Sequence, residues 1–189
     1  MKNILTLLFI LHIASTSCLA QGVFRNQTSS ALEKVVQDYP KQFKNIKGEQ
    51  LSSAKGSAEY KSNIIIPGAV STSITQTVAD QKQLVSWQSV VFAANDFNLA
   101  KKRFEELYNQ IKNTIIRPEG EKAVIVNGMY IDPSEDKTFT TIQFDLLPPS
   151  GTMQKVNIDL ILRNTGNQWK ITLSVYDKDR KETGTVAVK

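Results

Sequence analysis

Apolar and polar residues alternate along much of the second half of the chain. The alternation is clearest where every second residue from Val156 to Leu162 is Val, Ile or Leu. A period of two is typical of a β-strand with one buried face and one face in water. Separators rich in Pro, Gly, Asn, Asp and Ser favour tight turns between such segments. The pattern therefore predicts an antiparallel meander of four strands, at 123–131, 138–147, 155–164 and 169–176.

A different period, of three and four residues, follows Ser30. The spacing from Ser30 to Glu33 fits a capping box, so we expect the first helix to begin there. Pro40 lies inside the apolar pattern and predicts a kink or two abutting helices, because proline lacks the amide proton and clashes with the preceding turn. Gly48 is expected to end the second of them. The polar stretch 49–57 is expected to be a linker.

A second amphipathic helix is expected behind Asn95 or Asp96. Apolar residues recur from Phe97 to Ile115 at helical spacing, over five turns. Between the two helices, the segment 58–66 alternates like a strand until Pro67 and Gly68 turn the chain. Two further strands, expected at 73–78 and 84–93, are most simply connected as a hairpin.

These elements predict an α+β fold of order α-β-β-β-α-β-β-β-β. Two amphipathic helices would pack on one face of a mainly antiparallel sheet, because the apolar side of each element has to be buried. We expect one such domain at 29–177, preceded by a tether at 21–28 and followed by a charged tail at 178–189.

The first twenty residues have the order of a secretory signal peptide. Lys2 is followed by an apolar run and then by small and polar residues. Cys18 and Ala20 place small side chains before a cut that would leave Gln21 as the first mature residue. Alternatively, Cys18 itself would be lipidated and would anchor the protein to a membrane. The apolar run is shorter than the ~20 residues of a membrane-spanning helix, and no later segment is apolar enough to span.

The only histidine and the only cysteine, His12 and Cys18, lie in this leader. A chain cut after Ala20 therefore lacks the groups used by histidine-dependent triads, by Cys/His zinc sites and by thiol redox chemistry. Its 169 residues can bury a core without disulfides. We expect a periplasmic or secreted protein of the bacterial envelope.

The mature chain is mildly basic. Removing Lys2 leaves 22 basic against 18 acidic residues, a net charge of 22 − 18 = +4. The basic residues are not clustered with aromatic residues, as they commonly are in nucleic-acid binders, so nucleic acid is not expected as a partner. Lys41 and Lys44 belong to a basic outer side of the first helix, which could touch anionic lipids or acidic glycans or could simply keep the helix soluble.

Three aromatic residues are candidates for binding or for packing. Trp87, Tyr130 and Trp169 lie on expected strands, where an aromatic side chain either lines a ligand cleft or fills the core. No cofactor is expected. A cluster of carboxylates at Asp132, Glu135 and Asp136 is a weak candidate for calcium, since it lacks the spacing and the glycine of the usual twelve-residue loop.

The preferred hypothesis is a non-catalytic binding domain that acts through its open sheet face or through a pocket between sheet and helices. The ligand or protein partner, in the envelope or outside the cell, is unknown. One alternative is a hydrolase that uses two carboxylates, drawn from Asp132, Glu135, Asp145 and Asp159. Another is a carrier of a small apolar ligand in a cavity under the second helix.

Overall fold

The computed structural model describes residues 26–79 and 81–178. Within these residues, two α-helices accompany nine strands of one antiparallel sheet, in the order β1-β2-β3-β4-β9-β8-β7-β6-β5. The helices are α2 (Gln27–Asp38) and α3 (Phe97–Ile111), and short 3₁₀ helices lie at η1 (Tyr39–Lys41) and η2 (Gly151–Lys155). The strands are β1 (Lys47–Ala54), β2 (Ser57–Ser62), β3 (Ser71–Ala79), β4 (Lys82–Ala94), β5 (Ile115–Ile116), β6 (Val124–Asn127), β7 (Phe139–Leu147), β8 (Val156–Asn164) and β9 (Trp169–Asp177).

The expected meander and hairpin are both confirmed. β6, β7, β8 and β9 pair consecutively and antiparallel, and β3 pairs antiparallel with β4 from Ser71↔Val90 to Ala79↔Lys82. β9 then pairs with β4 along eight residue pairs, from Ser86↔Tyr176 to Ala94↔Trp169. This pairing joins the early and late strands into a single sheet.

The predicted strand order is wrong because it omits two strands. The stretch 49–57, expected to be a linker, forms most of β1 and the turn into β2. β1 is an edge strand whose side chains are exposed from Glu49 onward, so it needs no apolar alternation. β5 is only two residues long. The observed order among the described residues is α-β-β-β-β-α-β-β-β-β-β.

The start of α2 also differs from its prediction. Asn26 caps the helix, accepting a hydrogen bond of 2.7 Å at its Oδ1 from the backbone N–H of Ser29. Ser30 therefore lies inside the helix rather than at its cap. Gln27 and Thr28, assigned to the tether from the sequence, are helical, and Thr28 is buried.

The prediction that a helix follows Pro40 and ends at Gly48 is wrong as well. The chain turns after Pro40, because Gln42 and Phe43 adopt left-handed backbone angles with φ of 56° and 57°. The carboxylate of Asp38 holds this turn by accepting hydrogen bonds from the backbone N–H groups of Asn45 (3.0 Å) and Ile46 (3.3 Å). The apolar pattern up to Ile46 thus reflects burial in a turn, not a continuing helix.

The helix predicted behind Asn95 or Asp96 is confirmed as α3, and Asp96 is its cap. The Oδ1 atom of Asp96 accepts a hydrogen bond of 3.0 Å from the N–H of Leu99. α3 ends at Ile111, four residues before the end expected from the pattern. The hydroxyl of Thr114 donates to the carbonyl oxygen of Ile111 at 2.7 Å, and Ile115 already belongs to β5.

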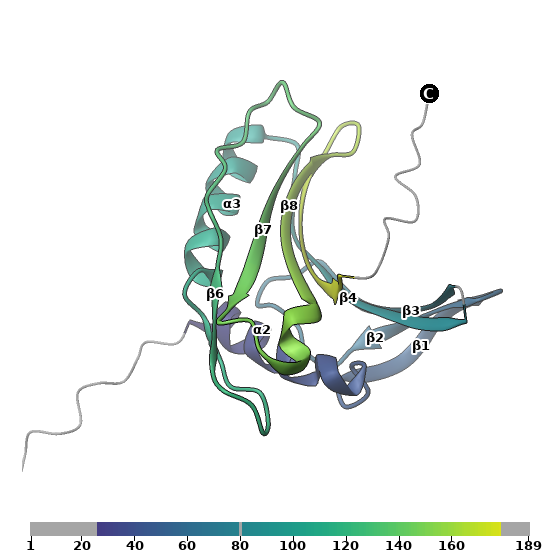
Figure 1. Ribbon diagram of the computed structural model, residues 1–189. Coiled ribbons are helices and arrows are strands. Elements are labelled where there is room, and N and C mark those ends of the chain that lie inside the picture. The colour runs from purple at the N-terminus through teal and green to yellow at the C-terminus, as the bar shows by residue number, and fades with distance from the viewer. Residues whose placement is uncertain (1–25, 80, 179–189) are drawn as a thin grey trace, which may run out of the picture.

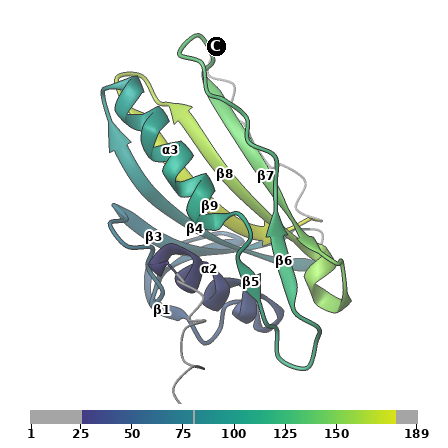
Figure 2. The same cartoon turned by 90° about the vertical axis from the view of Figure 1, so that its left-hand side faces the viewer.

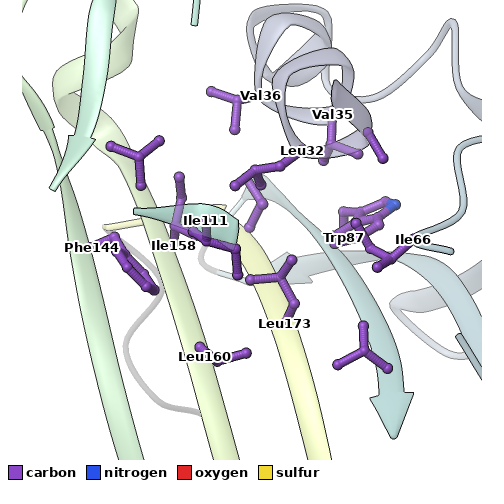
Figure 3. Packing of buried hydrophobic residues seen from close by; sticks show 14 of the residues in the cluster. Leu32, Val35, Val36, Ile66, Trp87, Ile111, Phe144, Ile158, Leu160 and Leu173 are labelled. Carbon is purple, nitrogen blue, oxygen red and sulfur yellow. The ribbon is translucent and has the colours of Figure 1, made fainter. Parts of the chain in front are cut away.

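The core lies between the helices and one side of the sheet. α3 lies across β4, β8 and β9, and α2 lies beside α3 (Figures 1 and 2). Side chains of α2 point toward the same cluster as side chains of the sheet and of α3 (Figure 3). We call this side of the sheet the covered face. On β8 and β9 it consists of Val156, Ile158, Leu160, Leu162, Ile171, Leu173 and Val175, which are all fully buried.

The opposite side of these strands carries no α-helix within the described part of the chain (Figures 1 and 2). We call it the open face. On β8 and β9 it presents Asn157, Asp159, Ile161, Arg163, Lys170, Thr172, Ser174 and Tyr176.

Candidate functional site

The open face presents a row of polar side chains across the middle of the sheet. Register places Gln143 of β7 opposite Asp159 of β8, and Asp159 opposite Ser174 of β9. The row continues through Gln88 of β4 to Ser73 of β3. Residues directly opposite one another lie close enough for their side chains to interact. A ligand on this face would therefore meet a continuous line of hydrogen-bonding groups.

Hydrogen bonds along the open face fix the orientation of several of these groups. The hydroxyl of Tyr176 donates to Oδ2 of Asp159 at 2.6 Å, a short bond of the kind that charged acceptors form. Beside it, the amide Nε2 of Gln143 donates to Oδ1 of Asn157 at 3.1 Å. The face thus offers oriented amides, hydroxyls and a carboxylate.

A second feature of the open face is a set of exposed apolar side chains at its β6–β7 border, interrupted by the polar pair Asn127 and Asp145. Ile125 of β6 lies opposite Leu147 of β7, and both are on the open face because their neighbours Val126 and Leu146 are buried. Beyond β6 the same alternation continues, so that Met129 and Ile131, which flank Tyr130, are exposed. Phe139, the first residue of β7, is exposed as well. We call these five residues the edge stripe: Ile125 (44% exposed), Met129 (82%), Ile131 (44%), Phe139 (53%) and Leu147 (42%).

Tyr130 lies within this segment but points the other way, toward α3. Its ring packs against the ring of Tyr108 with centroids 5.1 Å apart, and its hydroxyl lies 3.4 Å from Oδ1 of Asp132. Burial, together with the charges of Asp132 and Glu105, raises the pKa of Tyr130 to about 12. Tyr130 is therefore a neutral phenol below this pKa. Its packing against Tyr108 holds the segment that bears Met129 and Ile131.

Gly128 allows this segment to lie close against β7. A Cβ atom at Gly128 would lie 2.6 Å from Cδ1 of Phe144 and 2.9 Å from the carbonyl oxygen of Gln143. The hydroxyl of Tyr108 donates to the carbonyl oxygen of Gly128 at 3.1 Å. The lack of a side chain here sets the position of Met129 and Ile131 next to the sheet.

The predicted calcium candidates do not come together as a ligand set. Within the described residues, no three His, Cys, Asp or Glu side chains are placed to hold a metal ion. Asp132 instead forms an ion pair of 2.7 Å with Lys101, and Asp136 accepts a hydrogen bond of 3.4 Å from Ser134. Glu135 is exposed.

The two carboxylates Asp145 and Asp159 share the open face. Because Gln143 is the residue opposite Asp159, Asp145 lies diagonally from it, two residues further along β7. Asp145 is exposed, and its Oδ1 lies 3.9 Å from Nζ of Lys178. Neither carboxylate lines either of the two grooves described below.

Both tryptophans lie in the core. Trp87 is fully buried on the covered face, where its indole N–H donates to the hydroxyl of Ser62 at 3.0 Å. Trp169 is buried at the start of β9 and packs on Phe97, with ring centroids 4.9 Å apart. A ligand reaches neither ring unless the core opens, so the structure assigns both to packing.

Lys41 lines a shallow groove of about 410 Å³ beside α2. Its Nζ lies 3.0 Å from Oε2 of Glu119, and this hydrogen-bonded ion pair raises the pKa of Lys41. A neighbouring groove of about 160 Å³ shares Arg117 with the first and is lined mainly by polar residues, Asn26, Ser29 and Asn113 among them. Lys44 is exposed and lines neither groove.

None of the five residues of the edge stripe is among the candidate binding residues predicted from the sequence. A signal for the edge stripe was available, since Val124, Ile125 and Val126 are consecutive apolar residues and Met129, Tyr130 and Ile131 repeat the pattern. A strand with one face in water is expected to carry polar residues at alternate positions. Apolar residues on both faces therefore indicate either two buried faces or an exposed apolar surface.

Comparison of the chain with protein-family models, with curated proteins and with solved structures finds no match. Of the helices in the described part of the chain, none has the length and apolar character needed to cross a membrane.

Proposed function

We propose that this protein is an exported, non-catalytic binding domain of the bacterial envelope, which engages its ligand or partner through the open face and the edge stripe. The observation that carries the proposal is the edge stripe itself. Five large apolar side chains are exposed along one border of the sheet, between 42% and 82% of each. Large apolar side chains that are exposed together on one part of a surface are typical of a site of interaction.

The surroundings of the edge stripe support the same function. Protein interfaces commonly combine an apolar centre with a polar rim that supplies hydrogen bonds. The polar row from Gln143 to Ser73 borders the edge stripe and supplies such groups. Arg163, whose guanidinium lies 5.6 Å from the ring centre of Phe139, adds a positive charge at the end of the stripe. The expected partner therefore presents an apolar surface flanked by hydrogen-bonding groups.

The experiment is site-specific photo-crosslinking in the exporting cell. A photoreactive residue at Met129 is compared with one at Leu99, which is 57% exposed on α3. We expect a discrete adduct from position 129 that is absent from position 99, and its loss when Ile131→Glu is added. Equal adducts from both positions, or none from position 129, would contradict the proposal.

Export is the part of the proposal that rests on the leader, residues 1–20, which lie outside the described residues. The intact mass of the protein recovered from the envelope tests it. A mass that begins at Gln21 supports secretion or a periplasmic location, and a lipid-modified Cys18 supports a membrane-anchored form. Retention of the full leader would contradict export.

A carboxylate-based hydrolase is the second candidate. It is favoured by the diagonal placement of Asp145 and Asp159 on one face, since glycosidases use two carboxyl groups about 5–9 Å apart. Asp145→Asn and Asp159→Asn should each abolish hydrolysis of an envelope polysaccharide, while Asp136→Asn should not. Absence of hydrolysis by the unaltered mature protein would exclude this candidate.

A further inference from the structure

The described part of the chain ends on the open face, with its last side chain at the edge stripe. The backbone N–H of Lys178 donates to the carbonyl oxygen of Lys155 at 2.8 Å, so the chain continues the line of β9 past Asp177. The side chain of Lys178 turns to the open face, where its Nζ lies 3.9 Å from Oδ1 of Asp145. Asp145 and its cross-strand neighbour Asn127 are the polar pair that interrupts the edge stripe. Lys178 therefore reaches the edge stripe at this interruption.

The residues that follow Lys178 include a short apolar stretch. Residues 179–189, which we call the C-terminal segment, lie outside the described residues and have the sequence DRKETGTVAVK. Four charged residues come first, and a Thr-Val-Ala-Val stretch follows at 185–188. In an extended chain successive side chains point to opposite sides, so Val186 and Val188 would share one side. The C-terminal segment can thus present two valines together to an apolar surface.

The C-terminal segment is long enough to reach every residue of the edge stripe. Val186 is eight residues beyond Lys178, and an extended chain of that length spans up to ~26 Å. Along β7, Phe139 is the residue of the stripe farthest from Asp145, at six residues or ~20 Å. Leu147 lies only two residues from Asp145 in the other direction. Both ends of the edge stripe are therefore within reach of the valines.

Attachment to the same chain makes a small contact of this kind effective. A segment joined to its site by a short flexible linker is present there at a millimolar effective concentration. The exposed ion pair of Lys178 and Asp145 adds little stability, so it fixes where the segment starts rather than how firmly it binds. Packing of valines on the edge stripe removes apolar surface from water on both sides of the contact. The expected result is an equilibrium between a docked and a released segment.

We propose that the C-terminal segment packs over the edge stripe, through Val186 and Val188, when no partner occupies this surface. The inference rests on the proposed function, because the segment competes with the partner for the same side chains. A partner has to displace the segment, and its apparent affinity is reduced by the fraction of molecules in which the segment is docked. The C-terminal segment therefore regulates access to the edge stripe.

Disulfide trapping in the mature chain, residues 21–189, tests the contact without any partner. This chain has no cysteine of its own. Val186→Cys is combined with Met129→Cys in the edge stripe or, as the matched control, with Gln88→Cys. Gln88 is exposed on the same face, but on the other side of β9, opposite Ser174. At low protein concentration, we expect the intramolecular disulfide to form about tenfold faster with position 129, because docking raises the effective concentration of the two thiols.

A third variant separates docking from simple proximity. Ile131→Glu places a charge in the edge stripe beside Met129, so adding it to the first pair should remove most of the difference in rate. Equal rates for the pairs with positions 129 and 88 would overturn the inference. So would a faster rate at position 129 that persists with Ile131→Glu, because that contact would not depend on the apolar surface.

The photo-crosslinking experiment distinguishes this inference from the proposed function. Deletion of residues 183–189 should raise the yield of the adduct at position 129 about twofold, as expected for a site that the segment occupies half of the time. An adduct whose yield is unchanged by the deletion would contradict the competition. Rapid trapping without any adduct, from either the full or the shortened chain, would leave the docking intact and contradict the proposed function instead.

Discussion

β8 shows how differently the two faces of this sheet are built. On the covered face, its four side chains from Val156 to Leu162 are fully buried. On the open face, the intervening Asn157, Asp159 and Ile161 are only half-buried, and Arg163 is exposed. The covered face derives its stability from apolar burial, at roughly 25 cal/mol per Å². The open face contributes much less of this energy.

The edge stripe is the exception to this contrast. Its five apolar side chains lie on the open face, where burial within the described residues does not explain them. The difference between the two faces therefore identifies both the core and the candidate interface.

The sharpest test of the contrast uses two neighbouring residues of β4. Trp87→Ala removes a fully buried ring and its hydrogen bond to Ser62, so it should lower the free energy of unfolding by about 3–5 kcal/mol. Gln88→Ala, on the open face, should change it by less than ~0.5 kcal/mol. Urea denaturation measures both. Similar losses for the two variants would show that the open face is also part of the stabilising core.

A second test concerns the border between the faces. Gly128→Ala places a Cβ atom 2.6 Å from Phe144, so the segment that bears Met129 must move away from β7. We expect a loss of about 1–3 kcal/mol in the free energy of unfolding. Asn127→Ala, at the neighbouring exposed position, is the matched control and should have little effect. An unchanged free energy of unfolding in Gly128→Ala would mean that the segment that bears Met129 is held less tightly against β7 than the structure implies.

A third test concerns the N-terminal cap of α2, one of the two helices on the covered face. Asn26→Ala removes the cap on the Ser29 N–H and a hydrogen bond to the carbonyl oxygen of Gln110, and should cost about 1 kcal/mol. Ser30→Ala alters the residue that the sequence suggested as the cap and should change stability by less than ~0.5 kcal/mol. Thermal or urea unfolding separates them. The reverse order of effects would place the helix start at Ser30 after all.

The last test is the pH dependence due to Tyr130. Its pKa of about 12 in the folded chain exceeds the value near 10 of an unfolded tyrosine. The unfolded chain therefore loses this proton first, and the stability contributed by Tyr130 is present below about pH 10 and is lost as pH rises toward 12. Relative to Tyr130→Phe, the unaltered protein should lose stability over this interval. Parallel pH profiles of the two proteins would contradict the shift.

Much of the fold could be predicted where a strand or helix has one dry and one wet side. The meander, the β3–β4 hairpin and the start of α3 behind Asn95 or Asp96 follow from periodicity and capping alone, and the structure identifies Asp96 as the cap. β1 could not be found this way, because an edge strand that buries few side chains leaves no apolar pattern. The apolar spacing after Pro40 predicts a helix that does not form, because burial around the Asp38 turn spaces apolar residues as a helix would.

The candidate site was less predictable than the fold. Tyr130 belongs to the segment that bears the edge stripe, but its ring faces α3, and both tryptophans fill the core. An aromatic residue on a strand gives the same signal whether its face is covered or open, because periodicity does not specify what lies above that face.

The sequence by itself determined which residues alternate and where the chain can turn, since these depend on local backbone geometry and on the apolar character of each side chain. Only the tertiary structure decided that β9 pairs with β4, that both helices leave one face of β8 and β9 open, and that Met129 and its neighbours stay exposed. These outcomes depend on contacts between residues far apart in the chain, which stabilise the fold only after the loops between them have closed.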